Sequence, residues 1–351
     1  MSESPEDKAN STRRPVIGIT MGDPSGIGAE VVVKALADPA LRRAARYVVY
    51  GMNELISYAA DLAEIDPYWW RLQHDSPRAS YDLVHDVVVL DYDEYSMLGQ
   101  TVAKPSKQGG AASLRFLDDA IEAACRPAGT DGRIDAIVTG PICKESWQIC
   151  GCRFPGHTEL LAHRTKSRRV AMMFCAPKLN VVLATIHIPL MEVRNVLTIG
   201  RVYDPIDLGH QACVRMGLSK PRVAVCGLNP HASENGQFGD EEQRIIAPAI
   251  ELARQHGIDA SGPWPADTLF HQAVAGQYDL VVAMYHDQGL IPVKLLAFDE
   301  AVNVTLGLPI IRTSVDHGTA FDIVGRNRAN PGSMKAAIQL AIKLANGSTG
   351  G

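Results

Sequence analysis

The stretch Asp279-Leu-Val-Val-Ala-Met-Tyr-His-Asp-Gln-Gly289, followed by Lys294, decides the fold predicted for this chain. Leu280 to Met284 is an apolar run of strand length, and it ends in polar side chains that can bind a ligand. Such a change is typical of the carboxyl end of a buried parallel strand, where open α/β sheets hold their ligands. We therefore expect His286 at a functional site.

Two other apolar runs end in the same way. Residues 181–186 lead into His187, and residues 223–226 lead through a short loop to His231. Strand patterns alternate along the chain with helical patterns, such as the amphipathic segment 109–125. This alternation predicts a mostly parallel, doubly wound α/β protein in which three strands bring histidines to one edge of the sheet.

The composition is that of an ordinary soluble globular protein. With 351 residues, the chain is long enough for one large or two medium domains. Its 34 basic and 39 acidic residues give a net charge of −5, which argues against a nucleic-acid partner. No apolar run approaches the roughly 20 residues of a membrane helix, so we expect no membrane partner. We interpret residues 1–14 as a disordered tail and the seven cysteines as reduced thiols of a cytoplasmic protein.

Three neutral imidazoles can hold a divalent cation and leave one coordination position open for a substrate oxygen. His187, His231 and His286 form no compact metal motif, so three unrelated strand-end histidines remain the alternative. Lys294 and Arg312 add positive charge near the same edge, and an arginine can bind a carboxylate or phosphate in fork geometry. These residue types together suit an anionic substrate that carries a hydroxyl group.

Several loops add candidate ligand contacts. Residues 22–28 form a glycine loop between a strand and a helix, which suits either an anion or a tight βα turn. Lys144 follows another strand pattern, as an anion partner or as part of a surface turn. Asp267 lies in a short loop, where it can orient a histidine or bind a ligand. We interpret one basic run as a solvated face: Arg164, Lys166, Arg168 and Arg169.

Five motifs resemble those of the 4-hydroxythreonine-4-phosphate dehydrogenase family. They are Thr20-Met-Gly-Asp-Pro-Ser-Gly-Ile-Gly28, Pro155-Gly-His-Thr-Glu159, Gly227-Leu-Asn-Pro-His231, Met284-Tyr-His-Asp-Gln-Gly289 and Arg312-Thr-Ser-Val-Asp-His-Gly-Thr-Ala320. The resemblance extends from about Pro15 to Leu344, and the motifs are highly specific in combination. Only the N-terminal tail and the stretch around Trp69 lie outside it.

The resemblance implies an NAD-dependent oxidation of the C3 hydroxyl of a phosphorylated four-carbon acid, followed by decarboxylation. NADP is the other cofactor to consider. The family's metal ligands, which would hold zinc, magnesium, cobalt or manganese, correspond to His187, His231 and His286. Its substrate-binding residues correspond to His157, Thr158, Lys294, Asn303 and Arg312. The family is homodimeric with its site at the subunit boundary, so we expect the three histidines to come from two chains.

We predict two catalytic residues, Lys294 and Asp267. Lys294 is the candidate for proton transfer, and orienting the substrate is its milder alternative role. Asp267 would orient a histidine or bind the ligand directly.

The fold that the resemblance implies is that of the isocitrate and isopropylmalate dehydrogenases, a two-lobed α/β/α sandwich with a cleft between the lobes. We expect residues 15–150 and about 310–351 in one lobe and about 151–309 in the other. Residues 317–322, with Asn330 behind them, resemble the loop that holds the NAD adenosine in those enzymes. The predicted cofactor contacts are Gly318, Thr319, Ala320, Asp322 and Asn330. Asp322 would disfavour the 2′-phosphate of NADP if it points inward.

Three other functions stay open. Residues 234–241, 291–296 and 320–323 look closer to a branch of the family that oxidises D-threonate or D-erythronate 4-phosphate to dihydroxyacetone phosphate. A phosphosugar-acid binding protein without turnover is the second, although the retained histidines, Lys294 and Arg312 speak against it. A dehydrogenase for a non-phosphorylated diol acid is the third, and it would leave His157 and Thr158 without a phosphate to bind.

Overall fold

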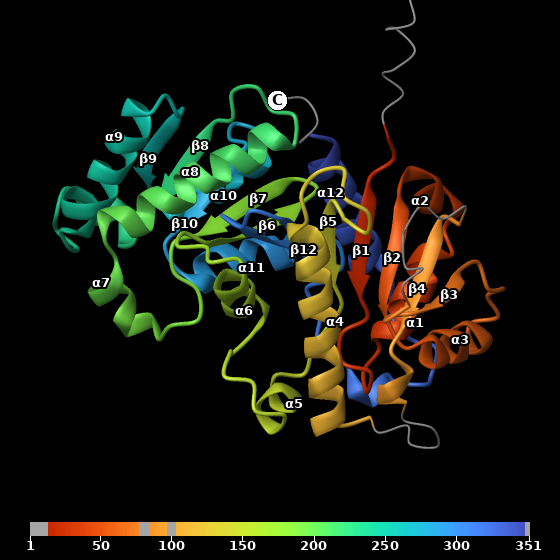
Figure 1. Ribbon diagram of the computed structural model, residues 1–351. Coiled ribbons are helices and arrows are strands. Elements are labelled where there is room, and N and C mark those ends of the chain that lie inside the picture. The colour runs from red at the N-terminus through yellow and green to blue at the C-terminus, as the bar shows by residue number, and fades with distance from the viewer. Residues whose placement is uncertain (1–12, 77–84, 97–102, 348–351) are drawn as a thin grey trace, which may run out of the picture.

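The computed structural model describes residues 13–76, 85–96 and 103–347, so most of the predicted tail lies outside the described residues. In this part of the chain, twelve strands form one central sheet with helices on both faces (Figure 1). The strands are β1 (Val16–Thr20), β2 (Arg46–Gly51), β3 (Trp70–Gln73), β4 (Val87–Asp91), β5 (Ala136–Thr139), β6 (Ala171–Ala176), β7 (Leu179–Leu183), β8 (Val223–Cys226), β9 (Ala260–Trp264), β10 (Leu280–Ala283), β11 (Val302–Leu306) and β12 (Ile311–Ser314).

Longer and shorter helices connect these strands. The α-helices are α1 (Gly28–Leu36), α2 (Pro39–Ala44), α3 (Asn53–Leu62), α4 (Lys107–Cys125), α5 (Lys144–Ile149), α6 (His157–Arg164), α7 (Val193–Val196), α8 (Ile199–Arg215), α9 (Ala247–Gln255), α10 (Ala266–Val274), α11 (His286–Ala297) and α12 (Gly332–Asn346). Single 3₁₀ or π-helical turns span Asp93–Tyr95, Leu190–Glu192, Pro230–Glu234, Glu242–Ile246 and Phe321–Ile323. None of the helices within the described ranges is long and apolar enough to cross a membrane.

The strand order confirms the α/β class and shows how the chain reverses. Across the sheet the order is β3-β4-β2-β1-β5-β12-β11-β6-β7-β10-β8-β9. Pairs are parallel except that β11 is antiparallel to both β12 and β6, and β6 is antiparallel to β7. The sheet is mixed because two residues connect β6 to β7, and so short a loop can join only antiparallel strands. The strands β7, β10 and β8 are parallel neighbours, so their carboxyl ends share one edge, as the apolar runs predicted.

Side-chain alternation divides the core between the two faces of the sheet. Val181 packs with Leu290 of α11 in one hydrophobic cluster, whereas the adjacent Val182 packs with Leu208 of α8 in the other. Successive strand residues point to opposite faces, so α11 and α8 cover opposite sides of the sheet. The same alternation applies to β11, where Val304 belongs to the cluster of the α8 face. Each face carries a cavity beside β11 and β12.

Candidate active site

A cavity of about 500 Å³ lies on the α11 face of the sheet. Its wall combines the carboxyl ends of β5 and β12, the first turns of α6 and α11, and side chains of β6 and β11. These elements are far apart in the sequence, and the sheet order brings them together. The lining includes eight of the predicted site residues: His157, Thr158, His187, His286, Lys294, Asn303, Arg312 and Gly318.

The wall of this cavity contains buried polar atoms without partners. His157 Nε2, Asn303 Oδ1 and His317 Nε2 are buried and form no hydrogen bond with any described residue. All three residues line the same cavity. Buried polar groups are normally paired, and leaving one unpaired costs about 1–3 kcal/mol. The cavity wall therefore favours a ligand that offers hydrogen-bonding groups to these three atoms.

Arg312 places a buried cation in the wall. Its side chain is 2% exposed, and the guanidinium donates to Thr139 Oγ1 at 2.7 Å and to Thr305 Oγ1 at 2.9 Å. Among the described residues it forms no salt bridge with a carboxylate. Burial lowers the pKa of Arg312 to about 9, so the group stays charged at neutral pH. A buried guanidinium held by two hydroxyl groups and facing a cavity is suited to an anionic ligand.

His157 and Thr158 form the first turn of α6, which begins at the cavity wall. The imidazole of His157 packs edge-on against Trp147 at 5.5 Å between ring centroids. Burial lowers the pKa of His157 well below its usual range, and the positive charges of Arg312 and Lys144 lower it further. The imidazole is therefore neutral, and the free N–H groups of a helix start can add donors for an anion.

The low pKa of His157 makes stability depend on pH. In the unfolded chain this imidazole takes up a proton below about pH 6.5, whereas in the folded protein it stays neutral to lower pH. Acid therefore favours unfolding, and the stability is present above the unfolded pKa and lost as the pH falls. Between about pH 6.5 and 5, we expect the free energy of unfolding to fall less steeply in His157→Gln than in the unaltered protein. The difference in slope is up to about 1.4 kcal/mol per pH unit. Thermal unfolding across this range measures it, with His271→Gln as control; equal slopes would contradict the burial of a neutral His157.

Lys294 has a partner that the sequence did not single out. Its Nζ lies 3.0 Å from Asp316 Oδ2, and both residues line the cavity. Asp316 stands two residues after β12, so its position after a strand end was the signal that could have identified it. Lys144 and Glu159 also line the cavity, which favours the ligand-binding alternative for Lys144.

The three histidines do not all meet within one chain. His187 and His286 lie with their ring centroids 5.8 Å apart, and both line the cavity. Burial lowers the pKa of His187, and the positive charges of Lys144 and His286 lower it further. The lowered pKa favours the neutral imidazole, which is the form that binds metals. Within the described part of the chain, no three His, Cys, Asp or Glu side chains are close enough to hold a metal ion. The expectation that one edge would gather all three imidazoles is therefore not met in a single chain.

His231 is turned away by an unusual loop after β8. Residues 231–235 all have positive φ, between 45° and 69°, which costs non-glycine residues about 1 kcal/mol or more each. Glu242 supports this loop by accepting from the backbone N–H groups of Leu228 and Asn229 at 2.8 and 2.7 Å. The His231 ring instead lies 6.4 Å from that of Phe238. Asp267 is exposed in the first turn of α10 and is not part of the cavity lining.

The predicted cofactor loop packs against the glycine loop of residues 22–28. Ile27 N donates to Thr319 O at 3.0 Å, and a side chain at Gly26 would press against Thr319. Ala320 has a φ of 43°, which turns the chain sharply at this point. Gly318 lines the cavity, whereas Asp322 and Asn330 are exposed. The loop therefore lies at the edge of the cavity, beside the buried and unpaired His317 Nε2.

Comparisons with known proteins agree along the chain. The family described as "Pyridoxal phosphate biosynthetic protein PdxA" matches residues 43–341. A 4-hydroxythreonine-4-phosphate dehydrogenase of Geobacter metallireducens is 46% identical over 96% of this chain and 98% of its own length. A D-threonate 4-phosphate dehydrogenase of Cupriavidus necator is 44% identical, over 94% and 97%. The crystal structure of a 4-hydroxythreonine-4-phosphate dehydrogenase from Klebsiella pneumoniae, 41% identical, superimposes with a TM-score of 0.81 and covers 94% of this chain and 99% of that one. The chain therefore belongs to the PdxA family of pyridoxal phosphate biosynthetic proteins.

Proposed function

We propose that this protein is a dehydrogenase that uses NAD to oxidise a secondary hydroxyl group of a four-carbon acid phosphorylated at C4, with decarboxylation. One observation carries the proposal: buried, unpaired atoms of His157 and Asn303 share a cavity with the buried cation Arg312. That wall suits a small molecule with anionic and hydroxyl groups. The dehydrogenase names of the relatives supply the reaction class.

Several polar residues of the cavity wall have roles in this proposal. His157, Thr158 and the start of α6 bind one anionic group, and Arg312 with Asn303 orients the other end of the substrate. Lys294 transfers the proton, and Asp316 holds its ammonium group in place. A divalent cation held by His187 and His286 would supply polarisation of the substrate oxygen, and NAD would supply the hydride acceptor. Gly318, Thr319 and Ala320 flank the cofactor, with Asp322 and Asn330 further out.

The cation requires a second copy of the chain in this proposal. Imidazoles of His187 and His286 are donors that suit zinc and related metals, but among the described residues no third His, Cys, Asp or Glu side chain joins them as a ligand. Large apolar side chains are exposed near both histidines: Leu190, at 62%, lines a hollow with His187 and His286, and the adjacent Met191 is 84% exposed. A homodimer that buries these side chains would cover the cavity and add His231 of the partner chain.

The walls of the cavity also support the proposed division into two lobes. Residues 140–142, Lys144 and residues 314–318 come from the proposed lobe of residues 15–150 and about 310–351. His157, Phe174 and His286 come from the proposed lobe of about 151–309. The cavity would then occupy the cleft between them.

Two substrates are candidates, and the relatives favour the first. Relatives named 4-hydroxythreonine-4-phosphate dehydrogenase reach 46% identity, and one named D-threonate 4-phosphate dehydrogenase reaches 44%. The main candidate is 4-hydroxythreonine 4-phosphate, with its 2-amino group, and the alternative is D-threonate 4-phosphate, with a 2-hydroxyl. The test mixes purified protein with NAD, a divalent metal and each acid, and follows NADH absorbance. Formation of NADH from neither acid would end the proposal, and thermal stabilisation by substrate without NADH would indicate a binding protein.

The replacement Lys294→Met is expected to lower kcat by about 10²- to 10⁴-fold, the range in which general acid–base catalysis contributes. KM should change far less, because the wall that binds the anionic groups is left in place. Steady-state kinetics on the variant and the unaltered protein measure kcat and KM. Lys335 also forms an ion pair, with Asp38, so Lys335→Met is the matched control. A kcat within about threefold of the unaltered enzyme would refute proton transfer by Lys294.

A further inference from the structure

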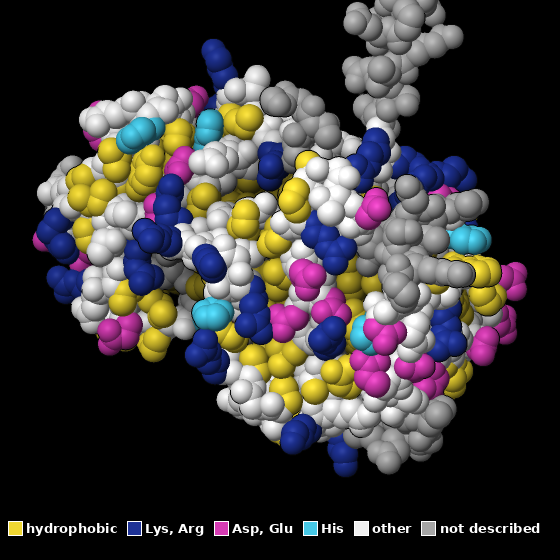
Figure 2. Space-filling model, viewed as in Figure 1, with side chains coloured by type: hydrophobic (Ala, Val, Ile, Leu, Met, Phe, Trp, Pro, Cys, Tyr) yellow, Lys and Arg dark blue, Asp and Glu magenta, His cyan; other side chains and the backbone are white. Residues whose placement is uncertain are grey.

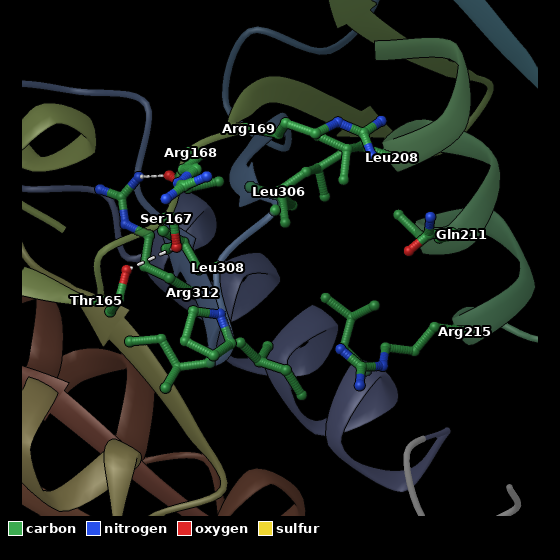
Figure 3. A pocket seen from close by; sticks show the side chains of 18 of the residues that line it. Thr165, Ser167, Arg168, Arg169, Leu208, Gln211, Arg215, Leu306, Leu308 and Arg312 are labelled. Carbon is green, nitrogen blue, oxygen red and sulfur yellow. Dashed lines mark hydrogen bonds between the residues drawn. The ribbon is translucent and has the colours of Figure 1, made fainter. Parts of the chain in front are cut away.

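A second and larger cavity, of about 820 Å³, lies on the α8 face of the sheet. Leu208 and Gln211 of α8 line it, together with Val304 and Leu306 of β11 (Figure 3). Asn303, adjacent to Val304 on the strand, lines the candidate active site instead. The two cavities therefore lie mainly on opposite faces of the sheet and share Arg312 in their linings, and the proposed dehydrogenase reaction makes no other use of the second one.

The basic run of residues 164–169 turns out to form part of this cavity. Lys166, Arg168 and Arg169 line it from the segment between α6 and β6, and Arg215 lines it from the end of α8. Figure 3 shows Arg168 at the left of the cavity, Arg169 along its top and Arg215 at its lower right. The interpretation of this run as a solvated face holds only for Arg164, which pairs with Asp118 at 2.8 Å and is absent from the lining.

Most of the positive charge at this cavity is not neutralised. Arg169 forms ion pairs with Asp204 and Asp207, both at 2.6 Å, which fix its position. Lys166, Arg168 and Arg215 form no ion pair with any residue that the structure describes. A chain with a net charge of −5 thus concentrates unpaired cations at one hollow. Such a cluster raises the local concentration of anions and binds phosphate groups well.

The rest of the wall supplies hydrogen-bonding and apolar groups. Thr165 and Ser167 lie beside the cations with their hydroxyl groups 2.8 Å apart, and Gln211 adds an amide. Leu208, Leu306 and Leu308 form an apolar part. The turn after β11 packs tightly against the backbone of Arg169. Gly307 has a φ of 82°, and any side chain there would overlap the carbonyl oxygen of Arg169. The volume lies in the range of pockets for small molecules.

We propose that this cavity is a second ligand site, which binds a phosphorylated small molecule with an apolar body. Lys166, Arg168 and Arg215 supply the positive charge that attracts the phosphate, and the three leucines contact the apolar body. Arg312, labelled in Figure 3, is part of the lining of both cavities, and its guanidinium donates a hydrogen bond to Thr305 Oγ1 of β11. A ligand in the second cavity therefore contacts the strands that position Arg312, so its occupancy should change the apparent KM of the dehydrogenase reaction.

Calorimetric titration with phenyl phosphate and with inorganic phosphate tests this site. We expect phenyl phosphate to bind more tightly, because only this ligand reaches the leucines. The double variant Arg168→Gln, Arg215→Gln should weaken phenyl phosphate by about tenfold or more. The control is Arg201→Gln, which removes an exposed cation from the same helix α8 but lies outside the cavity lining. Titration in the presence of substrate keeps the candidate active site occupied, so any remaining binding belongs to the second cavity.

The outcomes separate this site from the proposed reaction. All replaced side chains are exposed, so the variants should fold and keep the kcat of the unaltered protein when no phenyl phosphate is added. Equal phenyl phosphate affinity in the double variant and in the Arg201→Gln control would overturn the second site. Loss of phenyl phosphate binding when substrate is added would also overturn it, because the ligand would then occupy the candidate active site. A result of either kind leaves the dehydrogenase assay unaffected.

Discussion

Replacing Arg312 by methionine is expected to lower kcat/KM by roughly 10³-fold while leaving the protein as stable as before, or more stable. The activity falls because the guanidinium is the buried cation of the cavity wall, and removing one partner of a buried charged pair typically costs about 2–5 kcal/mol. At 1.4 kcal/mol for each factor of ten, a cost of about 4 kcal/mol within that range gives about 10³.

The stability is expected to move in the opposite direction. Burying a cation without a carboxylate partner costs free energy in the folded state, and the depressed pKa of Arg312 reflects this cost. Methionine removes the charge and keeps much of the volume. The hydroxyl groups of Thr139 and Thr305 lose a donor, which offsets part of the gain at about 1 kcal/mol each.

Thermal unfolding and steady-state kinetics on the same preparations measure both effects. The variant Arg43→Met replaces an exposed arginine without a side-chain partner among the described residues, and it should change neither quantity. Arg312→Lys keeps the positive charge but loses the forked geometry of the guanidinium, so most of the activity should still be lost. A melting temperature of Arg312→Met several degrees below that of the unaltered protein would contradict this prediction. It would show that Arg312 stabilises the fold, whereas we expect its burial to lower stability in return for substrate binding.

Mixing two inactive variants, His231→Ala and His286→Ala, is expected to restore activity. Each variant alone should lose at least about 10²-fold in activity, since each lacks one imidazole of the cation site. The structure places His187 and His286 together and His231 elsewhere in the same chain. In a mixed dimer, one site would therefore lack both imidazoles and the other would have all three.

The size of the restored activity follows from this arrangement. After random subunit exchange, half of the dimers are mixed and half of their sites are intact, which gives about a quarter of the unaltered activity in a symmetric dimer. His187→Ala is mixed with each of the other two variants in the same way. His271→Ala serves as the control, and metal content is measured on each sample. No recovery after demonstrated exchange would show that His231 and His286 do not serve one site from different chains.

Much of the fold followed from local patterns. The apolar runs before His187, His231 and His286 correspond to β7, β8 and β10, and the amphipathic pattern of residues 109–125 corresponds to α4. The hairpin of β6 and β7 was not predicted as such, because the sequence pattern does not show that two consecutive strands pair with each other. The antiparallel direction of β11 was not predicted either, because it depends on which strands become its neighbours in the sheet.

By itself, the sequence determined the class of the fold and the positions where polar side chains follow buried strands, because apolar runs and their periodicity are local properties. Only the tertiary structure decided which of those side chains meet. His231 turns away because Glu242 and Asn229 support a left-handed loop, and Arg312 is buried because β5 and β11 supply its two hydroxyl partners. The basic run became the wall of a cavity because α8 packs against the same face of the sheet. Each of these outcomes depends on contacts between distant segments, which no local pattern encodes.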